Sequence, residues 1–224
     1  MAHANVLKKA VFFWLLALVF FAAMLFIPAG TLDYWQGWLY MAVLFVPVSF
    51  VMLYFLKSDP EFLERRFRTR EKEARQQLVV KATGIIFFIG FLIPGLDRRF
   101  GWSQMPAEVS LVSACLVLMG YAIVFIVFRE NSYAGRTVEV EKGQKVISTG
   151  PYSVVRHPMY LGVIVLYVAT PFALGSYWAL PLFILIAPFL VIRIINEEEV
   201  LSRDLPGYGA YLGKVKYRLF PYVW

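Results

Sequence analysis

The chain has 224 residues, of which 60% are hydrophobic, 17% aromatic and only 17% charged. A charged fraction this far below the usual quarter excludes an ordinary soluble domain and indicates an integral membrane protein. The 22 Lys and Arg outnumber the 15 Asp and Glu, giving a formal net charge of +7. We attribute this charge to membrane topology and attraction to anionic lipid, and we expect no nucleic-acid partner.

Apolar runs long enough to be membrane helices recur along the chain. About 20 apolar helical residues cross a hydrocarbon core of roughly 30 Å. The third and fifth runs are short, so we prefer six spans and keep five as the alternative. The sequence therefore predicts an all-α integral membrane protein, a bundle of five to six transmembrane helices with a short polar loop and a C-terminal segment on the cytoplasmic side. The runs cover 11–29, 38–56, 82–96, 109–128, 160–174 and 177–195.

The distribution of basic residues predicts the orientation. Segments rich in Lys and Arg tend to stay in the cytoplasm. Of the 22 Lys and Arg, only Arg98 and Arg99 lie in a segment that alternates to the outside. We expect both termini in the cytoplasm, and because the chain is short and lacks eukaryotic retention signals, we expect a prokaryotic inner membrane. Cys115 has no thiol partner in the chain, and we expect neither a disulfide nor a metal site.

One membrane domain over residues 1–224 is the simplest organisation, because no long linker or repeat interrupts the chain. Residues 1–128 supply the N-terminal transmembrane helices, and 129–224 carry most of the chemistry-bearing residues. Between the second and third runs, 58–77 alternates acids and bases around aromatic residues, which predicts an interfacial amphipathic helix. It is either a lid or lipid-binding surface or, as we favour, a solvated connector.

Two polar segments on the same predicted side, 129–159 and 193–224, hold the unusual residues. The stretch 137–149 predicts a short hairpin or an ordered loop, which Gly150 and Pro151 then end. Small residues in the helices could allow close helix approach, and the alternative is that they are ordinary helix glycines. They include Gly84, Gly90, Gly120 and Gly162.

His157 is the chain's only internal histidine, in the stretch GPYSVVRHPMYLG. Pro158 suits the first turn of a helix, so His157 falls at the helix start, where unpaired N–H groups and the helix dipole favour an anion. Tyr160 projects from nearly the same face. We interpret His157 as marking the mouth of a ligand pocket at the membrane edge. The alternative is an interfacial histidine beside an anchoring arginine and tyrosine.

Arg193 and Glu197 lie four residues apart on one face of the last apolar helix. They can both point into a site or pair with each other. The alternative is that the charges mark the place where a helix leaves the bilayer. Because charges at a membrane edge are costly, we favour a functional role for Arg193.

These residues carry a family resemblance. The string 150–162, followed by Arg193, the Glu197-Glu198 pair, LPGYGAY at 205–211 and YRLFP at 217–221, resembles the isoprenylcysteine carboxyl methyltransferase and phospholipid methyltransferase superfamily. The resemblance covers about the last ninety residues, and the combination of RHPxY with EExxL is specific.

The resemblance implies an integral membrane methyltransferase that holds S-adenosylmethionine between C-terminal helices and loops, with 205–224 capping it, while a lipophilic or prenylated acceptor enters from the membrane lipid. Arg193 would bind the acceptor, and Arg193, Glu197 and Glu198 would be catalytic. At Gln144, eukaryotic members carry His. The residues implied to bind the cofactor are Gln144, Lys145, Val146, Ile147, Tyr152, His157, Pro158, Met159, Tyr160 and Glu197.

The chemistry of methyl transfer does not decide which class of molecule accepts the methyl group. A carboxylate of the isoprenylcysteine type, which we prefer, needs no general base, and Arg193 could orient it. A phospholipid amine must lose a proton, for which Glu198 or Glu199 would be nearest. An NADPH-dependent sterol or steroid reductase shares an RHPxY-like pattern and is the alternative in another reaction class. A noncatalytic lipid-binding protein is a further possibility.

Overall fold

The computed structural model describes residues 2–67, 71 and 73–224, which form helices joined by turns and loops and contain no strand. The all-α prediction is confirmed. The elements in chain order are α1 Ala2–Ala29, α2 Trp35–Ser58, α3 Pro60–Phe67, α4 Ala74–Phe100, α5 Ala107–Glu130, the 3₁₀ turn η1 Gly150–Ser153, α6 Pro158–Ala173, α7 Leu180–Asp204 and α8 Tyr208–Lys214.

Within the described residues, five helices are long and apolar enough to cross a membrane: α1, α2, α4, α5 and α7. The helix that contains the third run is longer than the run itself: α4 has 27 residues and continues past the apolar stretch at both ends. The fifth run is short, as expected, because α6 has 16 residues and so measures about 24 Å.

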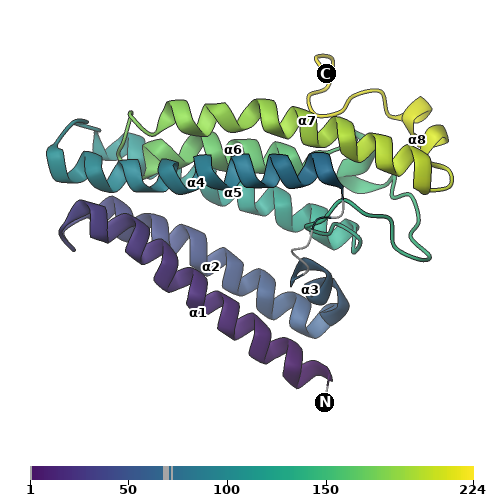
Figure 1. Cartoon of the computed structure of the whole chain (residues 1–224), viewed down its shortest axis with the longest axis horizontal. Coiled ribbons are helices and arrows are strands. Elements are labelled where there is room, and N and C mark those ends of the chain that lie inside the picture. The colour runs from purple at the N-terminus through teal and green to yellow at the C-terminus, as the bar shows by residue number, and fades with distance from the viewer. Residues whose placement is uncertain (1, 68–70, 72) are drawn as a thin grey trace.

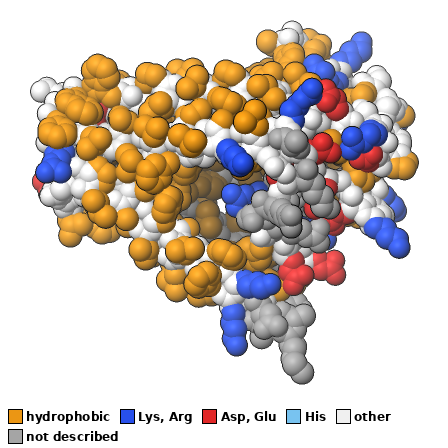
Figure 2. All heavy atoms as spheres, viewed as in Figure 1, with side chains coloured by type: hydrophobic (Ala, Val, Ile, Leu, Met, Phe, Trp, Pro, Cys, Tyr) orange, Lys and Arg blue, Asp and Glu red, His pale blue; other side chains and the backbone are white. Residues whose placement is uncertain are grey.

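The long helices run side by side, and the N-terminus lies toward the end that also carries α3, α8 and the loop 131–149 (Figure 1). Hydrophobic side chains cover most of the face shown in Figure 2, whereas Lys, Arg, Asp and Glu gather toward that same end. We call it the polar end.

The helices α5 and α6 pack backbone to backbone. A Cβ added at Gly120 would lie 2.9 Å from the Gly162 carbonyl oxygen, and one added at Gly162 would lie 2.9 Å from that of Gly120. These distances are too short for any side chain, so the expected close approach is confirmed at this pair. A Cβ at Gly90 would lie 3.1 Å from Phe183, whereas Gly84 faces open space, which agrees with the alternative of an ordinary helix glycine.

The end opposite the polar end is fixed by hydrogen bonds around Asp97, which is 2% exposed. Its carboxylate accepts hydrogen bonds from the backbone N–H and hydroxyl of Ser103, both at 2.7 Å, and from the Ser176 hydroxyl at 2.5 Å. Tyr34 donates to the Leu174 carbonyl at 2.6 Å. Turns and helices are therefore tied together at this end.

The segment 58–77 is not one helix. Asp59 accepts a hydrogen bond from the Phe62 N–H at 2.9 Å and starts α3, which ends at Phe67; Ala74 already belongs to α4, and 68–70 and 72 lie outside the described residues. Phe62 and Leu63 are buried. Arg65 donates to the Ser132 carbonyl at 3.0 Å, so α3 is a connector that also braces the loop after α5.

Candidate functional site

The loop 131–149 is ordered and forms no hairpin. Gln144 Oε1 accepts the N–H of Glu141 at 2.9 Å and closes a turn in which Gly143 has φ +81°. Only glycine adopts such a φ without strain. The Gln144 oxygen is thus used locally, which leaves its amide N–H groups for a ligand.

His157 lies where the sequence predicted it, at the N-cap of α6 with Pro158 as the first helical residue. Its backbone N–H donates to the Arg218 carbonyl at 2.9 Å. The residue is 5% exposed, and its Nε2 lies 3.2 Å from Glu198 Oε1. The C-terminal tail and α7 therefore fix the imidazole from two directions.

Glu198 is the centre of a buried ion-pair cluster. Arg156 Nε donates to its Oε1 at 2.6 Å, and Arg218 Nε donates to its Oε2 at 2.8 Å. Arg156 also donates to the carbonyls of Val215 and Lys216 at 3.0 and 2.9 Å. One carboxylate thus holds together the start of α6, the end of α7 and the C-terminal tail.

The neighbouring carboxylate, that of Glu197, belongs to a different network. The Tyr160 hydroxyl donates to Glu197 Oε2 at 2.7 Å and accepts from Arg193 Nε at 2.9 Å. Arg193 and Glu197 were expected to enter a site or to pair directly; the tyrosine hydroxyl lies between them. Consecutive helical residues point about 100° apart, which explains why Glu197 and Glu198 serve separate networks.

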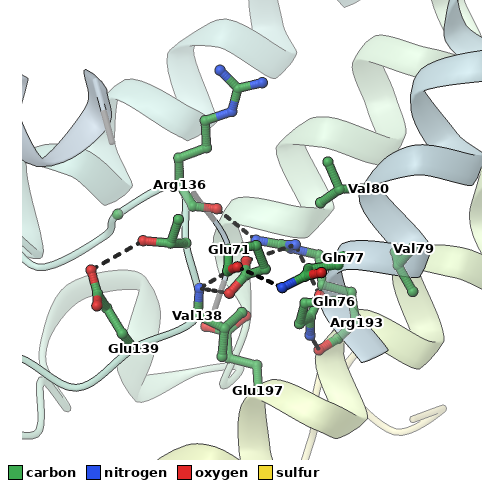
Figure 3. Close-up of polar contacts among 12 residues, drawn as sticks. Glu71, Gln76, Gln77, Val79, Val80, Arg136, Val138, Glu139, Arg193 and Glu197 are labelled. Atoms are coloured by element: carbon green, nitrogen blue, oxygen red, sulfur yellow. Dashed lines mark hydrogen bonds and ion pairs between the residues drawn. The ribbon is translucent and has the colours of Figure 1, made fainter. Parts of the chain in front are cut away.

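Arg193 also reaches the N-terminal half of the chain (Figure 3). Its Nη1 donates to Gln76 Oε1 at 2.9 Å, and Gln76 Nε2 donates back to the Arg193 carbonyl at 3.2 Å. Its Nη2 donates to the Arg136 carbonyl at 2.7 Å. Glu71, 3.9 Å from Arg193, accepts the Val138 N–H at 3.2 and 3.3 Å. Nothing in the sequence pattern singled out Gln76 or Glu71, because their partners lie more than sixty residues away.

A pocket opens between these networks. Pro158 and Glu198, both predicted for the site, do not line it, and Glu198 lies in the cluster behind His157 and Arg156. The predicted site residues that line the pocket are Gln144, Lys145, Val146, Ile147, Tyr152, His157, Met159, Tyr160, Arg193 and Glu197.

Other lining residues were missed or were expected only as part of a capping segment. Asn131 Nδ2 donates to the Tyr152 hydroxyl at 3.0 Å, and the Tyr211 hydroxyl donates to the Tyr152 carbonyl at 2.8 Å. Burial raises the pKa of Tyr152, although the Asn131 hydrogen bond opposes this, and burial raises the pKa of Tyr211 to about 12. These phenols therefore stay neutral at physiological pH and act as hydrogen-bonding walls, together with Tyr208.

Fold and site together define a class: a multi-pass membrane protein with a polar, partly aromatic ligand pocket at one end of its helix bundle. Residues 109–206 match the model of the phospholipid methyltransferase family. This match covers most of α5 and all of α6 and α7, including both motifs of the site, and shows that this part of the chain is similar to that family.

Two further proteins are similar to the chain. The Delta(14)-sterol reductase TM7SF2 of Mus musculus is 27% identical over 138 residues, which cover 53% of this chain and 33% of the reductase. The chain thus spans about a third of that relative's length. A solved structure of the eukaryotic intramembrane Ras methyltransferase ICMT (isoprenylcysteine carboxyl methyltransferase) aligns over 98% of this chain and 86% of its own, with a TM-score of 0.49 and 15% sequence identity.

Proposed function

We propose that the protein transfers a methyl group from S-adenosylmethionine to a lipophilic acceptor, with an isoprenylcysteine-type carboxylate as the preferred acceptor class. The observation that carries the proposal is the convergence, on one pocket, of His157 and Tyr160 from the RHPxY motif with Glu197 from the EExxL motif. The match of 109–206 to a methyltransferase family supports it.

The residues present fit the chemistry of this donor. The Glu197 carboxylate can accept hydrogen bonds from hydroxyl or ammonium groups, and the rings of Tyr152, Tyr208 and Tyr211 offer aromatic surface for a purine. The start of α6, where His157 is the N-cap residue, favours a carboxylate. No metal is needed for any of these contacts.

S-adenosylmethionine supplies, when bound, a methyl group activated by its positive sulfur. The chain's residues then have to orient the two reactants in line and exclude water around the nucleophile. Tyr160 links Glu197 on the donor side to Arg193 on the acceptor side. Arg193 contributes positive charge that orients an acceptor carboxylate, which needs no general base.

The placement of the acids favours a carboxylate acceptor over an amine. Glu198 is held by two arginines and does not line the pocket, so it is poorly suited to take a proton from an amine. Glu199 is exposed and pairs with Arg75 at 3.2 Å. A phospholipid amine would have to use as its base Glu197 or Glu139, the acids among the described residues that line the pocket.

An NADPH-dependent reductase is the second candidate, because the partial relative is a sterol reductase. Calorimetric titration of the detergent-purified protein with S-adenosylhomocysteine and with NADPH separates the two. We expect micromolar binding of S-adenosylhomocysteine, weakened about tenfold or more in Glu197→Gln and in His157→Ala, because each loses a polar contact in the pocket.

The exposed Glu199→Gln is the matched control and should bind S-adenosylhomocysteine like the wild type. Transfer of label from methyl-labelled donor to carboxylate and amine lipids then identifies the acceptor. Binding of NADPH without S-adenosylhomocysteine would reject the methyltransferase proposal and put the reductase first.

A further inference from the structure

The last residues of the chain form a small turn with an exposed apolar tip. The backbone N–H groups of Leu219 and Phe220 donate to the Trp224 carbonyl at 3.0 and 3.2 Å, and the Trp224 N–H donates to the Phe220 carbonyl at 3.1 Å. Within this turn the side chains of Phe220, Tyr222 and Val223 are exposed, the last two at 89% and 80%. We call residues 220–223 the tip. Most of its apolar surface is left uncovered by the chain.

The backbone of Tyr222 adds to the cost of this arrangement. Its φ is +65°, in the left-handed region that glycine adopts freely and tyrosine rarely. Among the described residues other than glycine, it alone has a positive φ. A glycine would close the same turn without strain. The tyrosine side chain therefore has to be stabilised by something outside the turn.

The base of the turn is fixed to the bundle. Leu219 is buried, and Trp224 packs against the main hydrophobic core. Arg218 Nε donates to Glu198 Oε2 at 2.8 Å, and the Arg218 carbonyl accepts the His157 N–H at 2.9 Å. The Arg218 guanidinium also lies 5.3 Å from the centre of the Trp224 ring. The tip is therefore a fixed protrusion from the bundle.

The same contacts place the tip at the level where the apolar surface of α7 ends. Val191 and Ile195 are exposed apolar residues of α7, whereas the exposed residue one turn further on is Glu199. Glu198, which holds Arg218, follows Ile195 by three residues, about 4.5 Å along the helix axis. In Figure 1 the end of the chain stands off from the side of α7 and not beyond the end of the bundle. The tip thus projects sideways at the edge of the apolar surface.

The composition of this segment suits a lipid surface. Residues 205–224 include four Tyr, one Phe, one Trp and three basic residues, and no Asp or Glu. Aromatic side chains are enriched at the level of lipid headgroups, and basic residues are attracted to anionic lipid. Lys214 and Lys216 are both exposed. A second copy of this segment would carry the same positive charge and be repelled.

We propose that the tip inserts into the headgroup region of the membrane around the bundle, and that this insertion holds residues 215–224 against the start of α6. Lys214 and Lys216 then lie beside anionic headgroups. Because His157 lines the pocket and is bonded to this segment, the membrane stabilises one wall of the pocket. The insertion does not depend on the proposed function, and neither measurement below requires a cofactor or an acceptor.

Spin labels measure the depth of the tip. A nitroxide is attached at Val223→Cys in a Cys115→Ala background, since Cys115 is the chain's only cysteine. The full chain is placed at low density in vesicles of phosphatidylcholine and phosphatidylglycerol. Matched exposed positions are Val191→Cys on the apolar part of α7 and Lys142→Cys in the polar loop.

The readout is the ratio of collisions with oxygen to collisions with a water-soluble nickel chelate. We expect this ratio at Val223 to exceed that at Lys142 about threefold or more and to approach that at Val191, because interfacial apolar side chains lie roughly 5–10 Å into the headgroup boundary. Equal ratios at Val223 and Lys142 would place the tip in water and overturn the proposal. A label shielded from both reagents would show that protein covers the tip and would overturn it as well.

Hydrogen exchange measures whether insertion holds the segment in place. The N–H groups of Arg156 and His157 donate to the carbonyls of Tyr217 and Arg218, both at 2.9 Å, so their exchange reports detachment of the segment from α6. The double variant Tyr222→Ser with Val223→Ser removes the apolar tip and leaves every residue of the base unchanged.

In vesicles, these two N–H groups should exchange about tenfold faster in the double variant than in the wild type. Unchanged exchange in the middle of α5 shows that the bundle stays folded. Lys142→Gln, which alters an exposed residue of the polar loop, should exchange like the wild type. Equal exchange at 156 and 157 in the double variant and the wild type would overturn the holding role of the membrane.

Discussion

The two ends of the bundle each bury a carboxylate, but they satisfy it in opposite ways. Asp97 is surrounded by the hydroxyls of Ser103 and Ser176 and by a backbone N–H. Glu198 is surrounded by Arg156, Arg218 and His157. Hydroxyls both donate and accept, whereas guanidinium groups only donate. The first end can therefore adapt to a changed partner, and the second cannot.

This difference suits the work of each end. The Asp97 end needs only to join turns, since the described pocket lies at the other end. At the polar end, loop, tail and helix termini must be held around an open pocket with few apolar contacts. Charged hydrogen bonds from long side chains span such a region, and they fix geometry at a cost in desolvation.

The largest effect is expected for Glu198→Gln. The amide presents an N–H₂ group to donors that cannot accept, so at least one buried arginine loses its partner. Breaking a buried ion pair costs about 3–5 kcal/mol, which for a chain of this size lowers the thermal midpoint by roughly 6 °C or more. Thermal unfolding in detergent measures this.

The same variant should bind S-adenosylhomocysteine poorly, since His157 and the tail lose their common anchor. A Glu198→Gln protein that unfolds at the wild-type temperature would mean that the cluster contributes little, and the contrast between the ends would collapse.

An intermediate effect is expected for Asp97→Asn. The asparagine oxygen can still accept the Ser103 N–H, and its amide can donate to serine hydroxyls that turn around, because Ser176 Oγ already accepts the Ala179 N–H at 3.3 Å. We expect a loss of about 1–2 kcal/mol in the free energy of unfolding. The affinity for S-adenosylhomocysteine should stay within about twofold of wild type, because Asp97 does not contact the ligand and the loss of a direct contact would change the affinity by more. A loss of ligand binding as large as that of Glu198→Gln would show that the two ends are coupled.

The sequence allowed the helical parts of this comparison to be predicted better than its polar contacts. Apolar runs predicted the spans, and Pro158 predicted where α6 begins. The resemblance brought Tyr160, Arg193 and Glu197 to one site, and they do meet. The prediction of a single amphipathic helix over 58–77 was wrong because the alternation of acids and bases continues across the end of α3 and the start of α4.

Long-range partners could not be predicted from local pattern. Glu198 looks like a second catalytic acid beside Glu197, yet its partners come from 156–157 and the C-terminal tail. Gln76 meets Arg193 because α4 packs against α7, and Glu71, which precedes α4, lies 3.9 Å from the same arginine. The spacing of residues along a helix predicts which side chains share one face of it. Which residues of other elements contact that face depends on tertiary packing.

The smallest effect is expected for Glu199→Gln, one residue from the cluster. Its pair with Arg75 joins α7 to α4 as Glu198 joins α7 to the tail, but the two side chains are 56% and 65% exposed. Water and salt screen such a pair, so its loss should change the free energy of unfolding by no more than about 0.5 kcal/mol. The thermal midpoint, measured at low and at high salt, checks this. A shift that approaches that of Glu198→Gln would show that charge alone, and not burial with donors that cannot accept, holds the polar end together.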